Sequence, residues 1–160
     1  MTDIKHNANL LFLREDQLYE SMELLFFAYR DFTTECDKIL SAYDFGRAHH
    51  RAIYFIARNP NISVTELLEI LRITKQSLSR VLSQLVDNEY VITEQCKVDH
   101  RRRLLKITDK GSELEDKLSK IHKEILSRAF RGAGAEAVAG YRNVLLGIID
   151  EKDHKRFKKR

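Results

Sequence analysis

The chain has 160 residues, of which 43% are hydrophobic and 32% are charged, and its formal net charge is +4 at pH 7. This length and mixture suit one folded domain with a hydrophobic core and exclude an intrinsically disordered chain. Its longest apolar runs, such as Leu24 to Tyr29, are far shorter than the roughly 20 residues that cross a bilayer, so no membrane helix is predicted.

The first residues and the cysteine content indicate the compartment. The start of the chain, MTDIKHNANLLFLRED, holds only a short apolar patch before charged residues return, so a secretory signal peptide is not predicted. Cys36 and Cys96 are too few for a disulfide scaffold, and both could remain reduced thiols. We therefore expect a cytoplasmic protein.

The charge is unevenly distributed along the chain. Lys and Arg against Asp and Glu give a net charge of −4 over residues 1–71, +4 over 72–106, zero over 107–150 and +4 over 151–160. A basic segment in the middle of a neutral or acidic chain is typical of a surface that faces nucleic acid. The basic C-terminal end, EKDHKRFKKR, is equally well explained as solvated surface.

The first predicted element is a long helix with an unusually wide apolar face. Its apolar residues recur at alternating spacings of four and three: Leu18, Met22, Leu25, Tyr29, Phe32, Cys36, Ile39 and Tyr43. Phe26, Phe27 and Leu40 widen this face beyond what one neighbouring element would cover. We expect a second chain to pack against it.

The next segments predict a helix-turn-helix. A helix over residues 45–58 ends at Asn59-Pro60-Asn61, a turn-forming sequence. Ser63 and Glu66 then form a capping box that starts a short helix. Thr74 is the N-cap of a third helix after a tight turn, and two short capped helices joined in this way are the helix-turn-helix signature.

The third helix carries residues suited to reading DNA. Its apolar positions fall on one side, and its outward positions hold short polar or cationic side chains until Asp87 is reached. Such side chains can donate to or accept from base edges and phosphates. The candidates are Lys75, Gln76, Ser77, Ser79, Arg80 and Ser83, with Thr74 as a cap and potential phosphate ligand.

Two short strands follow, separated by a basic connection. Residues 90–93 and 104–107 read as strands, and the connection between them holds Lys97 and the run Arg101, Arg102 and Arg103. A β-ribbon beside a helix-turn-helix is a wing, whose cations can reach the DNA backbone or a narrow minor groove. Thr108 then caps a long helix, residues 131–134 break it, and a last helix follows.

At this point the chain resembles the MarR (multiple antibiotic resistance regulator) family of winged helix-turn-helix transcription factors. The resemblance rests on SVTELLEILRITKQSLSRVLSQLVDNEYV and on the wing motif DHRRRLLKITDKG, residues 99–111. It implies homodimers held by the N-terminal helix and the C-terminal helices, here Leu18 to Tyr43 and Leu114 to Ile148. It also implies a salt bridge between Asp99 and Arg101 that directs the arginine to DNA.

The resemblance further implies control by a small aromatic or anionic effector bound between the dimerisation helices and the DNA-binding lobe. Residues that could line such a pocket are Tyr29, Phe32, His49, Arg51 and Tyr54. Two positions depart from the family pattern. Asn88 stands near a common glycine, where it could adopt a left-handed conformation, and Thr93 replaces a common basic residue on the first wing strand.

Four other functions are weighed against this interpretation: a metal site, a redox sensor, an enzyme and an architectural or protein-binding winged helix. His49 and His50 point about 100° apart on a helix and lack a metal-ligand spacing, so no metal is predicted. A cysteine-based redox sensor is an alternative within the family; Cys36 falls on the apolar stripe, whereas Cys96 lies among cations. No catalytic motif is present, so an enzyme is not predicted and no cofactor is expected. A non-specific architectural or protein-binding winged helix is the alternative from a different class.

The sequence therefore predicts a mainly α fold with a small β-wing. Three segments are expected: residues 1–44 as an N-terminal dimerisation helix, 45–108 as the winged helix-turn-helix lobe, and 109–160 as C-terminal dimerisation helices with a basic tail. The expected function is sequence-specific binding of double-stranded DNA, as a homodimeric regulator, and most simply a repressor, on a palindromic operator. Half-site centres would lie roughly 10 bp apart, and no contact with a membrane is expected.

Overall fold

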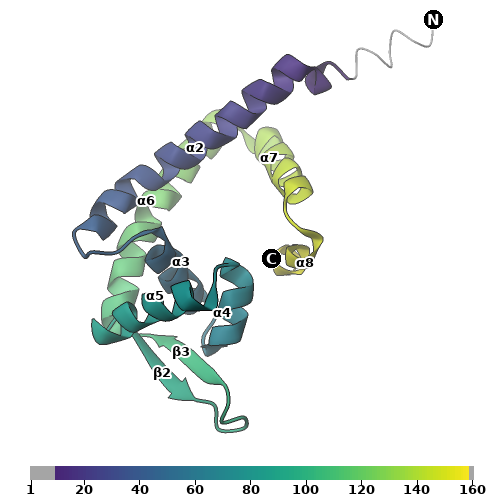
Figure 1. Ribbon diagram of the computed structural model, residues 1–160. Coiled ribbons are helices and arrows are strands. Elements are labelled where there is room, and N and C mark those ends of the chain that lie inside the picture. The colour runs from purple at the N-terminus through teal and green to yellow at the C-terminus, as the bar shows by residue number, and fades with distance from the viewer. Residues whose placement is uncertain (1–9, 159–160) are drawn as a thin grey trace, which may run out of the picture. The chain divides into compact units, whose positions relative to one another are not determined.

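A computed structural model describes residues 10–158, so residues 1–9 and the last two residues of the basic tail lie outside the described part. The fold is mainly helical with one small antiparallel sheet, which confirms the predicted class (Figure 1). The elements are the 3-10 helix η1 (Leu11–Leu13), α2 (Glu15–Ser41), α3 (Arg47–Arg58), β1 (Ile62–Ser63), α4 (Val64–Leu71), α5 (Lys75–Asp87), β2 (Val91–Gln95), β3 (Arg103–Ile107), α6 (Asp109–Ala133), α7 (Ala135–Ile148), α8 (Glu151–His154) and η2 (Lys155–Phe157). The chain divides into two compact units, the first reaching to Ser119 and the second beginning at Lys120.

The first unit contains the helix-turn-helix and the wing. Its core combines side chains from α2, α3, α4, α5, the sheet and the start of α6, with the largest fully buried ones being Leu40, Ile53, Ile56, Leu67, Leu78, Leu85, Leu105 and Leu118. The expected dimerisation segments thus contribute to this core, because Leu40 lies in the last turn of α2 and Leu114 and Leu118 belong to the first turns of α6. The apolar face of α2 that remains exposed lies toward its N-terminal end, with Leu18, Met22, Leu25 and Phe26 in the open.

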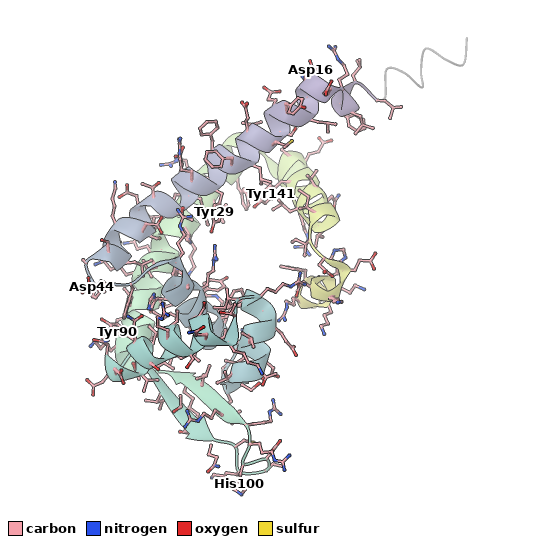
Figure 2. All side chains as sticks on the ribbon, viewed as in Figure 1. Asp16, Tyr29, Asp44, Tyr90, His100 and Tyr141 are labelled. Atoms are coloured by element: carbon pink, nitrogen blue, oxygen red, sulfur yellow. The ribbon has the colours of Figure 1, made fainter. Side chains whose placement is uncertain are left out.

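The sheet has one strand more than the sequence analysis predicted. β1 is only two residues long and pairs antiparallel with β3 through Ile62 and Leu105. β3 also pairs with β2, from Val91 opposite Ile107 to Gln95 opposite Arg103. The β2–β3 hairpin projects beyond the helices, and Figure 2 places His100 at its tip.

The turn between α5 and β2 corrects a detail of the sequence analysis. Asn88 could adopt the left-handed conformation, but its φ is −94°; the left-handed residue is one position later, where Glu89 has a φ of 63°. The reason is a Schellman motif: the amide of Glu89 donates to Val86 O at 3.0 Å and that of Tyr90 to Leu85 O at 2.8 Å. Asn88 is the C-cap, and its side chain donates to Gln84 O at 2.7 Å.

The second unit consists of the rest of α6 and the C-terminal helices. Gly134 has a φ of 87° and separates α6 from α7, as the Arg131-Gly132-Ala133-Gly134 break predicted. Phe130 contacts Tyr141 edge to face at 5.6 Å between ring centroids. His154 Nε2 lies 2.8 Å from the carbonyl oxygen of Leu146 and caps the end of α7, so α8 and η2, which the sequence analysis did not predict, close against that helix.

Candidate nucleic-acid interface

The helix-turn-helix is built by caps that its own sequence supplies. Ser63 Oγ accepts from the amide of Glu66 at 3.1 Å, and Glu66 Oε2 accepts from the amide of Ser63 at 2.8 Å, which confirms the predicted capping box. Arg72 ends α4 in a left-handed conformation with a φ of 50°. Thr74 Oγ1 then accepts from the amide of Ser77 at 3.1 Å and starts α5, as predicted.

Helix α5 has one buried side and one exposed side. Leu78, Val81, Leu82 and Leu85 are buried against the core. The predicted DNA-contacting residues of this helix are all exposed: Lys75, Gln76, Ser77, Ser79, Arg80 and Ser83. Fixing the apolar side in the core therefore directs the hydroxyl, amide and cationic groups outward.

The tip of the wing is held by hydrogen bonds within the hairpin. The amide of Cys96 donates to Arg102 O at 2.9 Å, and the amide of Arg102 donates to Asp99 O at 2.9 Å. Gln95 Nε2 donates to His100 O at 2.8 Å. These hydrogen bonds connect the two sides of the loop formed by residues 95–102. They therefore fix the backbone conformation that precedes and begins the arginine run.

Asp99 contacts the backbone of Arg101 rather than its side chain. Asp99 Oδ1 accepts from the amide of Arg101 at 3.0 Å. Among the described residues no ion pair joins the Asp99 and Arg101 side chains. In place of the predicted salt bridge, the Asp99 carboxylate accepts a hydrogen bond from the Arg101 backbone amide. The physical reason is proximity, since a carboxylate two residues before an amide closes an Asx turn without extending the arginine.

Two ion pairs attach the wing to its surroundings. Arg102 lies 3.5 Å from Glu66 at the start of α4, and Lys106 lies 2.7 Å from Glu94 on the neighbouring strand. The amide of Ser63 lowers the pKa of Glu66, with the Ser63 hydroxyl and Arg102 contributing further. Glu66 is therefore a stable anion that both caps α4 and holds one wing arginine.

A groove of about 490 Å³ separates α5 from the wing. Its walls bring together six of the predicted site residues: Lys75, Ser79, Ser83, Arg101, Arg102 and Arg103. Gln76, Ser77 and Arg80 lie on the flank of α5, and Lys97 lies on the wing, outside the residues that line the groove. Asp87 and Thr93, which were not among the predicted site residues, also line the groove.

The two thiols have different environments. Cys36 is fully buried and its Sγ donates toward Leu118 O at 3.6 Å; burial raises its pKa to about 11, with Asp37 and Glu35 adding to the shift. Cys96 is half-buried in the wing, and the backbone amides of Asp99 and then Val98 lower its pKa. Cys36 is buried, as the sequence predicted, and the surroundings of Cys96 favour its thiolate more than those of Cys36 do.

The residues that could line an effector pocket contact one another or neighbouring side chains. Arg51 donates to the hydroxyl oxygen of Tyr29 at 2.6 Å, and the guanidinium of Arg47 lies 5.5 Å from the centre of the Tyr29 ring. Tyr54 instead lies under Arg58 at 3.9 Å. His49 faces α5, where its Nε2 lies 2.5 Å from Gln84 Oε1. Across residues 10–158 no group of three or more His, Cys, Asp and Glu is arranged to hold a metal, and no helix is long and apolar enough to span a membrane.

Comparison with known proteins decides the family. The sequence model of the MarR family matches residues 43–102. The HTH-type transcriptional regulator PetP of Rhodobacter capsulatus is 48% identical over 141 residues, which are 88% of this chain and 85% of that protein. This chain belongs to the MarR family. It is accordingly a transcriptional regulator and not an enzyme.

Solved structures of MarR-type proteins share the fold. Streptococcus pneumoniae FabT in complex with DNA matches with a TM-score of 0.73 and 18% identity, covering 82% of this chain and 94% of that one. A mutant MarR from E. coli complexed with operator DNA matches with a TM-score of 0.66 and 20% identity, covering 88% and 99%. A MarR protein from Peptoclostridium difficile matches with a TM-score of 0.70 and 19% identity, covering 92% and 94%. At these identities the likeness concerns the winged-helix fold.

Proposed function

We propose that this MarR-family chain is a homodimeric, sequence-specific repressor that binds a palindromic operator in double-stranded DNA. The single observation that carries the proposal is the groove between α5 and the wing, which gathers cations and hydroxyl groups on one exposed surface. Two of the fold relatives were solved with DNA, one of them with operator DNA, which favours the same use of the fold here.

Helix α5 and the wing have different roles in this proposal. Helix α5 enters the major groove, where Lys75, Gln76, Ser79, Arg80 and Ser83 contact base edges and phosphates. The wing follows the adjacent minor groove, with Arg101 nearest to it and Lys97, Arg102 and Arg103 supplying backbone affinity that salt weakens. Thr74 and Ser77 lie at the N-terminus of α5, which favours a phosphate.

The homodimer is proposed from uncovered apolar surface. The N-terminal half of α2 exposes Leu18, Met22, Leu25 and Phe26, and in the second unit α7 exposes Val144 and Ile148. Apolar side chains in such numbers mark a protein interface. We propose a second copy of the chain as the partner that covers this apolar surface. A two-fold dimer presents two recognition helices to the two halves of a palindrome. Residues 1–44 and 109–160 would supply the dimer contacts and residues 45–108 the DNA contacts.

Regulation and location complete the proposal. An aromatic or anionic effector would find a cation and a phenol at Arg51 and Tyr29, and it would release DNA by favouring a lobe separation that no longer matches the grooves. The protein would act in the cytoplasm. When it is bound to the operator, it would exclude the transcription machinery from the regulated promoter. The family assignment favours this regulator over an architectural winged helix.

Selection from a randomised duplex library tests the proposal. The protein should enrich one inverted repeat with half-site centres roughly 10 bp apart, and sedimentation of the complex should give two chains per duplex. Transcription in vitro from a promoter carrying that repeat should fall when the protein is added. Enrichment of no sequence, with binding that depends only on salt, would support the architectural alternative.

A further inference from the structure

The ring of His49 is fixed by three contacts at the start of α3. Its Nδ1 accepts from the amide of Gly46 at 3.0 Å, which closes the first turn of the helix. The ring stacks on Phe45 with centroids 4.7 Å apart and planes 14° apart. Phe45 is buried and itself contacts Tyr90 edge to face at 5.2 Å, so the ring plane of His49 follows from packing in the core. The third contact is with the recognition helix.

The tautomer of His49 follows from these contacts. Since Nδ1 accepts from an amide, the neutral ring carries its proton on Nε2. Nε2 lies 2.5 Å from Gln84 Oε1, so His49 donates and the Gln84 oxygen accepts. The amide nitrogen of Gln84 must then point away from His49 with its two N–H groups unused by this contact. His49 therefore fixes both the position and the flip state of the Gln84 side chain.

Gln84 occupies a useful place on α5. It is exposed and lies one helical turn beyond Arg80, on the flank of the helix that faces α3. About half or more of the hydrogen bonds between proteins and DNA go to phosphate and sugar oxygens, and glutamine amides are among the donors. Among residues 10–158, no hydrogen-bond partner is recorded for the Gln84 side-chain nitrogen. A phosphate oxygen is the acceptor that such a pair of N–H groups would bind.

We propose that Gln84 contacts a DNA phosphate beside the half-site and that His49 is the residue that positions it. The inference rests on the proposed use of α5 as the recognition helix. His49 does not touch DNA in this account. It orders a side chain that would otherwise sample several rotamers, so less freedom is lost when the phosphate binds.

A double-mutant cycle on operator affinity tests the inference. Gln84→Leu removes the amide from an exposed position, and His49→Phe keeps the stacked ring but removes both nitrogen contacts. Gln84→Leu should weaken binding about tenfold, His49→Phe should weaken it less, and the double variant should bind like Gln84→Leu alone. If the two losses multiply instead, His49 acts through the fold and the positioning role is wrong.

Removing the charge of single DNA phosphates tests independently whether Gln84 binds a phosphate. Replacing single phosphates of the duplex by methylphosphonates should reveal one position beside each half-site, the two related by the symmetry of the palindrome, where wild type loses affinity and Gln84→Leu loses none. If every methylphosphonate affects both proteins equally, Gln84 does not bind a phosphate. If Gln84→Leu binds like wild type while Arg80→Ala does not, this inference fails and the proposed function stands. If Arg80→Ala also binds like wild type, the proposed recognition helix itself is wrong.

Discussion

Arg58 of α3 donates a 2.7 Å hydrogen bond to Glu115 of α6, joining the helix-turn-helix lobe to the helix that leads out of it. Glu115 has only 5% of its side chain exposed, whereas Arg58 keeps 28% exposed. Arg58 also donates to Ser119 Oγ at 3.3 Å, and the Ser119 hydroxyl bonds to Glu115 in turn. Both donors converge on Glu115 Oε1, so the nearly buried carboxylate keeps two hydrogen bonds on that oxygen.

Removing one member of this network should destabilise the first unit. Glu115→Ala leaves Arg58 without its anion in a partly buried site, and we expect the free energy of unfolding to fall by about 3 kcal/mol, the lower end of the range for buried pairs, because Arg58 keeps some contact with water. Urea denaturation followed by circular dichroism measures it. The paired replacement Arg58→Met with Glu115→Leu should recover most of the loss; recovery of none would show that the shape of the site, not its charge, matters.

Gly111 tests the close approach of α6 to the sheet. A Cβ at this position would lie 2.1 Å from the carbonyl oxygen of Tyr90 and 2.9 Å from side-chain carbons of Ile107. Gly111→Ala should therefore lower the free energy of unfolding by about 1–3 kcal/mol. Gly132→Ala is the matched control, because apart from the neighbouring residues and backbone of its own helix no described heavy atom lies within 4 Å of its added Cβ. Equal thermal melting of the two variants would contradict this packing.

The two cysteines should differ in reactivity. At pH 8 a thiol-specific disulfide reagent should label Cys96 in the native protein and leave Cys36 unlabelled, and Cys96→Ser should abolish the reaction. Because the buried Cys36 thiol holds its proton more tightly than the ordinary value of 9.0, the stability it contributes is fully present below that pH and is lost as the pH rises toward about 11. Rapid labelling of Cys36 in the native state at pH 8 would contradict its burial. If oxidation of Cys96 released operator DNA, the redox alternative would gain support.

Self-association should depend on the exposed face of α2. Met22 is 65% exposed and Leu25 is 52% exposed, so Met22→Glu combined with Leu25→Glu places two charges where the second copy would pack. The double variant should sediment as a monomer at concentrations where wild type is a dimer. Glu20→Lys alters a charge on the opposite side of the same helix and should leave the dimer intact. A double variant that still dimerises would place the interface elsewhere.

Local sequence chemistry predicted the caps and breaks of this fold well. Ser63, Thr74 and the glycine break before α7 act within a few residues of themselves, so their sequence context is sufficient. The wing strands were also correct to within one or two residues. These features require no knowledge of what lies across the molecule.

Features that depend on distant partners could not be predicted in this way. β1 is two residues long and exists only because Ile62 meets Leu105 across the sheet. The contact of His49 with Gln84 joins residues 35 positions apart and gives no pattern in the sequence. The Asp99 contact with the Arg101 amide was missed for another reason: a family pairing of side chains was carried over where a local turn forms instead.

Affinity for the selected operator, compared between two arginine variants and one control variant, distinguishes base reading by α5 from binding that depends on charge alone. Fluorescence anisotropy at two salt concentrations would follow wild type, Arg80→Ala, Arg101→Ala and Lys117→Ala, the last an exposed cation on α6 away from the groove. We expect Arg80→Ala to lose about 1–3 kcal/mol of binding free energy and to relax one operator position, and Arg101→Ala to weaken binding to all sequences and reduce the salt slope by about 1. Lys117→Ala should bind like wild type. If all three variants weaken binding equally at low salt and none changes the preferred sequence, the exposed side of α5 and the wing do not form the DNA-reading surface.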